Sequence, residues 1–175
     1  MSSLLITGFT NFGKVENNPS EILVNLLKQK YQNNIDCYIF KGYKDIDDNL
    51  EHLLSKSPTT VIIFGLASKT PYVRLEKVAK IPSRLKTGEK QYRSNLPLRE
   101  IYMKLVENNI RVAYSNSAGD YWCNYLFYKV SSAREHNQKY KQGFIHIPNL
   151  DAYNSINAKE LNLLNFGSTI VDLFL

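Results

Sequence analysis

Cysteine is scarce in this chain of 175 residues, which carries only Cys37 and Cys123. Two cysteines so far apart lack the spacing of a metal site and cannot form a disulfide framework. Such sparing use of cysteine is typical of proteins from a reducing compartment, so we expect the cytoplasm. The sequence predicts neither a bound metal nor a cofactor.

Long apolar runs are also missing. No stretch approaches the roughly 20 apolar residues that a membrane-spanning helix needs. The apolar N-terminus, residues 1–9, has no basic head and is too short to predict a signal peptide. The net charge is +6, but lysines and arginines are scattered and no dense basic block alternates with aromatic residues. We therefore expect a solvated basic surface and neither a membrane nor a nucleic acid as partner.

What the chain does have is a regular alternation of apolar runs and helix-like segments. Strands are predicted at 3–9, 35–40, 60–66, 72–81, 110–114 and 143–148. Helices are predicted at 18–31, 45–56, 98–108 and 123–136, with a loop or flap at 82–97. A terminal helix is predicted to begin at the capping pattern of residues 157–160 and to run towards 175, with a break near Gly167. The apolar strand at 110–114 is expected to be buried. This order predicts one α/β domain spanning residues 1–175, a three-layer α/β/α fold with a mostly parallel central sheet.

The stretch around Cys123 is the most informative. A loop of small residues, Ser115 to Gly119, joins the strand at 110–114 to a helix that begins near Cys123. At a helix start, unpaired N–H groups and the helix dipole favour an anion, which biases a thiol toward thiolate. The alternative is a buried apolar filler, because free cysteine is among the most buried residue types.

Two further residues have types that suit nucleophilic catalysis. Glu76 and His146 lie, like Cys123, at or near predicted strand ends, and together they supply a thiol, a base and an orienting acid. Each has an ordinary alternative, an exposed acid for Glu76 and a satisfied core histidine for His146. Phe9 and Phe12 flank the end of the first strand, at the sheet edge where α/β proteins bind ligands, although both rings also suit the core.

The motifs resemble those of the pyroglutamyl-peptidase I (pyrrolidone-carboxylate peptidase) family of cysteine peptidases, in the same order and over nearly the whole chain. The matching segments are Thr7-Gly8-Phe9-Thr10-Asn11-Phe12-Gly13, Asn18-Pro19-Ser20, Gly65-Leu66-Ala67 with Leu75-Glu76-Lys77-Val78-Ala79, Ser117-Ala118-Gly119-Asp120-Tyr121-Trp122-Cys123-Asn124, and Gly143-Phe144-Ile145-His146-Ile147-Pro148. Any one motif is weak, but five in order are specific.

The resemblance implies removal of N-terminal pyroglutamate from small peptides through a Cys-His-Glu triad. Cys123 would attack the pyroglutamyl carbonyl, His146 would accept and return the proton, and Glu76 would orient the imidazole. Backbone N–H groups near Cys123 would hold the oxyanion. Water would then release pyroglutamate from a thioester.

The resemblance also assigns residues to substrate binding. Phe9 and Phe12 would sandwich the lactam ring, with Tyr121 beside them. Leu66 stands where some members carry a glutamine that contacts the substrate. Trp122 replaces a smaller residue beside the nucleophile, and we expect its ring to pack outward on the loop at 80–95 rather than into the pocket.

The sequence departs from the family pattern at two further places. Ser68-Lys69-Thr70 replaces Gly-Gly-Arg, and the segment 80–95 is short. Three interpretations stay open: an active pyroglutamyl peptidase, a cysteine hydrolase with a reshaped pocket and another acyl or amide substrate, and a non-catalytic binding protein. The sequence also leaves a homo-oligomer open.

Overall fold

The central element of the computed structural model is a six-stranded sheet, within a structure that describes residues 4–85, 90–137, 139–149 and 163–175. The strand order is β2-β1-β3-β8-β4-β7. Their bounds are β1 Leu4–Phe9, β2 Asp36–Phe40, β3 Thr60–Ala67, β4 Val73–Glu76, β7 Val112–Ser115 and β8 Lys141–Pro148. Four of the five neighbouring pairs are parallel, and only β4 and β8 run antiparallel.

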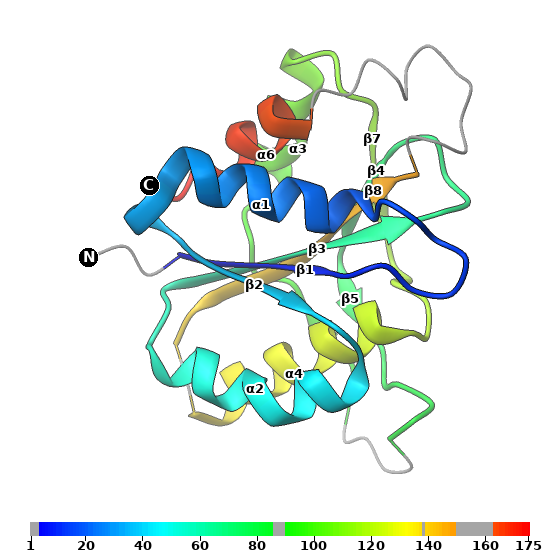
Figure 1. The fold of residues 1–175 in the computed structure, drawn as a ribbon, viewed down its shortest axis with the longest axis vertical. Coiled ribbons are helices and arrows are strands. Elements are labelled where there is room, and N and C mark those ends of the chain that lie inside the picture. Colours follow the sequence, from blue (N-terminus) through cyan, green and yellow to red (C-terminus); the bar gives the residue numbers. More distant parts are fainter. Residues whose placement is uncertain (1–3, 86–89, 138, 150–162) are drawn as a thin grey trace.

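Helices cover both faces of this sheet (Figure 1). One layer contains α1 (Pro19–Tyr31), α3 (Leu98–Glu107) and α6 (Leu163–Val171), and the other contains α2 (Tyr43–Ser55) and α4 (Trp122–Asn137). A 3-10 turn, η1 (Gln32–Asn34), leads from α1 to β2. The predicted three-layer α/β/α fold with a mostly parallel sheet is confirmed.

Hydrophobic pattern explains the layers. All eight residues of β3 are buried, as expected for a central strand covered on both faces. In α2 the buried residues are Ile46, Leu50, Leu53 and Leu54, which form one helical stripe facing the sheet. Among the described residues, no helix is both long and apolar enough to cross a membrane.

The segment predicted as one strand at 72–81 is divided between two sheets. β4 belongs to the main sheet, whereas β5 (Val78–Ala79) pairs antiparallel with β6 (Tyr92–Arg93). Lys77 lies at the break: its N–H donates to the Ser115 carbonyl, and its own carbonyl accepts from the N–H of Ser94. The backbone thus leaves the main sheet after β4, and part of the expected flap is a short strand.

Two further expectations were wrong in detail. The strand near Ile110 was expected to be buried, but β7 lies at the edge of the sheet and Tyr114 is exposed. The terminal helix was expected to break near Gly167, but α6 runs through it from Leu163 to Val171. Gly167 lies so close to α1 that a Cβ there would be 2.5 Å from Leu23 Cδ1. Glycine allows the two helices to pack closely. The predicted cap at 157–160 lies outside the described residues.

Candidate active site

Glu76 and His146 form a buried acid–base pair. Nδ1 of His146 lies 2.7 Å from Oε1 of Glu76, and the two side chains are 6% and 0% exposed. Glu76 is the last residue of β4 and His146 lies near the end of β8, so the antiparallel pairing of these strands brings them together. Because Nδ1 donates to the carboxylate, the other ring nitrogen, Nε2, is left as the acceptor.

Strand register places the thiol on the same face as this pair. Gly65 on β3 is the partner of His146 on β8, and paired residues point to the same side of a sheet. A Cβ on Gly65 would lie 3.0 Å from Sγ of Cys123 and 2.7 Å from Cζ of Phe144. The ring of Phe144 in turn contacts the imidazole, with centroids 4.3 Å apart. Cys123 and His146 therefore lie on one side of the sheet, the side covered by α2 and α4.

Cys123 is the second residue of α4 and is buried. In the first turn of a helix the backbone N–H groups have no partner within the helix, so they are free to bind an oxyanion. Within the described ranges, no hydrogen bond joins Sγ of Cys123 to His146. The structure thus joins the acid and the base directly and places the thiol nearby.

Burial controls the resting protonation of the site. It raises the pKa of the Cys123 thiol to about 12, with the charge of Glu76 adding to the effect. It lowers the pKa of His146, against the opposing influence of the Glu76 carboxylate. The expected bias of Cys123 toward thiolate is therefore outweighed by desolvation, and the resting site holds a neutral thiol and a neutral imidazole.

A pocket of about 450 Å³ opens beside His146 at the carboxyl ends of the strands. Leu66, one of the predicted substrate residues, lies in its wall. The rest of the wall mixes apolar residues with the polar residues Ser68, Lys69, Thr70, Arg74 and Ser117. The three residues that replace the expected Gly-Gly-Arg therefore line the space next to the base.

The predicted aromatic residues divide into two groups. Phe9 is 1% exposed and its ring faces Phe40 at 6.4 Å, so it belongs to the core. Phe12 instead contacts Tyr121 and Trp122, with ring centroids 5.5 and 5.6 Å away. The rings of Phe9 and Phe12 thus have different neighbours, and their joint role in holding a lactam stays a prediction.

Trp122 does not line the pocket beside His146. Its ring stacks on Tyr121, contacts Phe12 and Tyr43, and lies close to Gly42, where a Cβ would be 3.3 Å from the indole. The ring therefore packs away from this pocket. It packs on the start of α2 and the loop after β1 instead of on the loop at 80–95. Among the described residues of the loop at 80–95, Arg84 reaches this group, with its guanidinium 4.5 Å from the ring centre of Tyr43.

The chain is similar in sequence to known peptidases. The chain is 30% identical over 173 residues to a pyrrolidone-carboxylate peptidase of Fusobacterium nucleatum subsp. nucleatum, covering 86% of this chain and 79% of that protein. The chain belongs to the pyroglutamyl peptidase family. The family model described as pyroglutamyl peptidase matches residues 83–162, which include Cys123 and His146.

Solved structures of the family share the fold. Pyrrolidone carboxyl peptidase from Thermococcus litoralis has a TM-score of 0.79 at 26% identity, covering 98% of this chain and 94% of that one. Pyroglutamyl peptidase I from Bacillus amyloliquefaciens has a TM-score of 0.79 at 24% identity, covering 98% and 95%. Both structures match over 98% of the chain, so almost the whole of this pyroglutamyl peptidase family member shares their fold.

Two residues that the sequence analysis did not single out are central to the site of this family member. Arg74 contacts Glu76, as described below. Asn124, next to the thiol and buried, exchanges two hydrogen bonds with the backbone of Lys80: its Oδ1 accepts from the N–H at 3.1 Å and its Nδ2 donates to the carbonyl at 2.9 Å. The signal for Arg74 was its position two residues before Glu76, on the same face of a strand.

The Asn18-Pro19-Ser20 motif has a structural role. Asn18 caps α1 through a bond from the N–H of Ser20 at 3.0 Å, and its Nδ2 donates to the Thr10 carbonyl. The hydroxyl of Ser20 accepts from the N–H of Phe9 at 3.1 Å. These bonds fix the end of β1 and the loop that carries Phe12.

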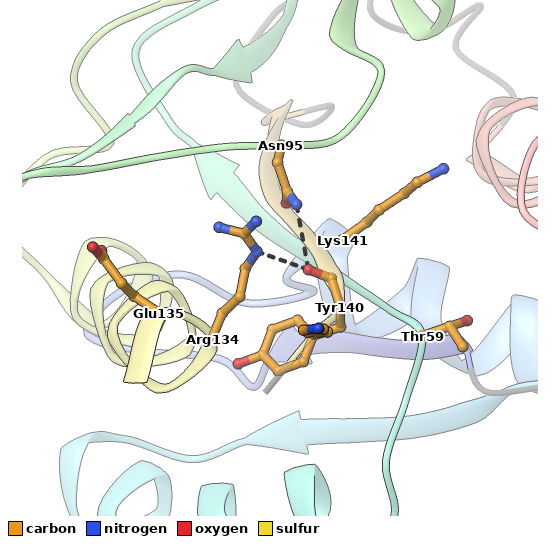
Figure 2. Close-up of a pocket in the computed structure, with 7 residues that line it drawn as sticks. Thr59, Asn95, Arg134, Glu135, Tyr140 and Lys141 are labelled. Atoms are coloured by element: carbon orange, nitrogen blue, oxygen red, sulfur yellow. Dashed lines mark hydrogen bonds between the residues drawn. The ribbon is translucent and has the colours of Figure 1, made fainter. Parts of the chain in front are cut away.

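A second hollow, of about 670 Å³, lies at the opposite ends of β3 and β8 (Figure 2). There Arg134 Nε and Asn95 Nδ2 both donate to the carbonyl of Tyr140, at 2.9 and 3.3 Å. Its lining contains neither a cysteine nor a histidine. In the described part of the chain, moreover, no group of three His, Cys, Asp or Glu residues could hold a metal ion. The predicted catalytic residues of this family member lie elsewhere, on the face of the sheet that holds His146.

Proposed function

We propose that this chain is a cysteine peptidase that removes pyroglutamate from the N-terminus of small peptides. The observation that carries the proposal is the buried contact between Glu76 and His146, on the face of the sheet that also holds Cys123 at a helix start. Family membership supports pyroglutamyl peptides as the substrate, and the geometry supports the roles of Cys123 as nucleophile, His146 as base and Glu76 as acid.

The reaction begins with proton transfer. The neutral His146 accepts the thiol proton at Nε2 while Sγ of Cys123 attacks the pyroglutamyl carbonyl. Catalytic hydrogen bonds often tighten only when substrate is bound, so we expect Nε2 to close on Sγ at that stage. Glu76 stabilises the imidazolium that forms, and N–H groups of the first turn of α4 hold the oxyanion.

Breakdown of the tetrahedral intermediate completes the cycle. The imidazolium gives its proton to the leaving amine, the C–N bond breaks, and a thioester joins pyroglutamate to Cys123. Water, deprotonated by His146, then attacks the thioester, and pyroglutamate leaves as the thiol takes back a proton. This series of steps needs no metal and no cofactor.

We also infer that residues 1–175 act as one domain, since β1 and β8 belong to the same sheet.

The cellular compartment of the enzyme is inferred from the chemistry of the thiol. Cys123 must stay reduced to act as a nucleophile, and Cys37 is also a free cysteine. A reducing compartment preserves both. We therefore place the enzyme in the cytoplasm.

Hydrolysis of pyroglutamyl-coumarin, beside prolyl- and alanyl-coumarin, tests the proposal. We expect turnover of the pyroglutamyl substrate alone, its loss in Cys123→Ser, and normal activity in the matched variant Cys37→Ser. Turnover of the prolyl or alanyl substrate instead would favour a hydrolase with a reshaped pocket. Inactivity on all three would favour a binding protein.

A further inference from the structure

We propose that Arg74 is a positioning residue of the triad, which supplies the permanent counter-charge to the buried Glu76 side chain and thereby sets the charge balance of the pair that Glu76 forms with His146. The inference rests on the proposed function, because it assigns a role within the same site. It concerns a residue that is not part of the triad itself.

Arg74 and His146 both contact the same oxygen atom of Glu76. Nη2 of Arg74 lies 3.1 Å from Oε1 of Glu76, and the same oxygen lies 2.7 Å from Nδ1 of His146. The register of the antiparallel pair β4–β8 places Arg74 directly opposite His146. A single carboxylate oxygen is therefore shared by the guanidinium and the imidazole.

Burial makes this counter-charge necessary. Glu76 is completely buried, and a buried carboxylate without a compensating charge takes up a proton instead. His146 cannot compensate it at rest, because burial lowers the pKa of the imidazole and leaves it neutral near pH 7. Arginine stays protonated in proteins, and Arg74 is itself only 22% exposed.

Among the described residues, no other group near the imidazole fills this role. Glu76 and Arg74 face it from β4, and the Cys123 thiol, a neutral group, lies on the same side of the sheet beside Gly65. Lys69 lines the same pocket from the loop after β3, but its side chain is exposed to solvent, which screens its charge. Arg74 is therefore the cation in contact with the pair.

Arg74 also connects the pair to the nucleophile's loop. Its Nη2 donates to the hydroxyl of Ser115 and to the carbonyl of Ser117. These residues begin the loop that leads from β7 into α4 and Cys123. The guanidinium thus joins the acid–base pair to the loop that sets the position of the thiol.

The test compares Arg74→Met with Arg74→Lys and with Arg111→Met, a matched control at an exposed arginine just before β7. The pKa of His146 is followed by NMR titration, which is tractable because the chain has three histidines. Without Arg74, the pair formed by Glu76 and His146 binds a proton more readily, whether the proton resides on the carboxylate or on the imidazole. We expect Arg74→Met to raise the pKa of His146 by about one unit or more, while Arg74→Lys and Arg111→Met leave it near the wild-type value.

Kinetics give a second readout. The acid limb of kcat/KM should move to higher pH in Arg74→Met, and kcat should fall roughly tenfold or more with little change in KM. An unchanged imidazole pKa together with an unchanged acid limb in a folded Arg74→Met variant would overturn the proposal. An inactive wild-type protein would instead overturn the proposed function, and the NMR titration would still decide the role of Arg74.

Stability separates a counter-ion from a simple brace, even if Arg74→Met does not fold. Arg74→Met is introduced into wild type and into Glu76→Gln, which removes the buried charge, and the loss in Tm is measured against each background. If Arg74 is the counter-ion, the loss in Tm is large in wild type and much smaller in Glu76→Gln, where the double variant should fold. Equal losses in both backgrounds, or failure of both to fold, would show that Arg74 acts independently of the Glu76 charge and would overturn the proposal.

Discussion

Gly65 and Cys123 lie so close that a Cβ on the glycine would be only 3.0 Å from the sulfur. The same Cβ would lie 2.7 Å from Cζ of Phe144, the residue whose ring packs against His146. The position of the nucleophile above β3 therefore depends on the absence of a side chain at residue 65. Packing, as well as hydrogen bonding, sets the geometry of the site.

Gly65→Ala tests this dependence. The added methyl must displace the Phe144 ring or the thiol, so we expect a loss of roughly 1–3 kcal/mol in unfolding free energy and a lower kcat with KM little changed. Urea unfolding and steady-state kinetics measure the two effects. Adding Phe144→Leu, which makes room beside residue 65, should restore part of the stability, and wild-type activity in Gly65→Ala would show that the close contact is unimportant.

His146 gives the protein a pH dependence of known sign. Its pKa is lower in the folded protein than the ordinary value of about 6.5 that it has when unfolded. The unfolded state therefore binds more protons, so this contribution to stability is present above about pH 6.5 and is lost as pH falls through the lower folded pKa. Between pH 8 and pH 5, the Tm of His146→Asn should fall less than the Tm of wild type. An equal dependence of Tm on pH in the two proteins would contradict the assignment.

Alkylation distinguishes a neutral thiol from a preformed thiolate. With a pKa of about 12 for Cys123 and about 11 for Cys37, both cysteines are protonated at neutral pH. Because only the thiolate reacts, the rate of iodoacetamide modification should rise about tenfold per pH unit from pH 6 to 9. Single-cysteine variants, Cys37→Ser and Cys123→Ser, separate the two sites. Fast modification of Cys123 below pH 7, with no dependence on pH, would indicate a thiolate–imidazolium pair instead.

The sequence was sufficient for the fold and for the order of the site residues, because both follow from local patterns. The continuous apolar run of β3 and the helical stripe of α2 predict buried elements directly. The contact between Glu76 and His146 depends on the register of two strands 70 residues apart, which no local pattern specifies. The resting protonation of Cys123 was also beyond the sequence, since helix position favours the thiolate and only the structure reveals the burial that outweighs it.

Trp122 provides a test of the aromatic group beside the nucleophile. Its indole is partly buried, stacks on Tyr121 with ring planes 13° apart, and lies near Phe12 and Tyr43. It lies outside the pocket lined by His146, so a smaller residue opens no space there. Instead, Trp122→Val removes packing between α4, the start of α2 and the loop after β1.

We therefore expect Trp122→Val to lower both stability and activity. A fully buried tryptophan costs roughly 3–5 kcal/mol when truncated to alanine, and the loss here should be smaller because the ring is partly exposed and valine keeps some volume. Trp122→Phe, which retains an aromatic ring, should recover most of the stability in thermal unfolding. kcat/KM on pyroglutamyl-coumarin should fall in Trp122→Val, since Phe12 and Tyr121 lose the surface that holds their rings. A gain in kcat/KM would mean that the indole obstructs the substrate, and that the lactam binds among these rings rather than beside His146.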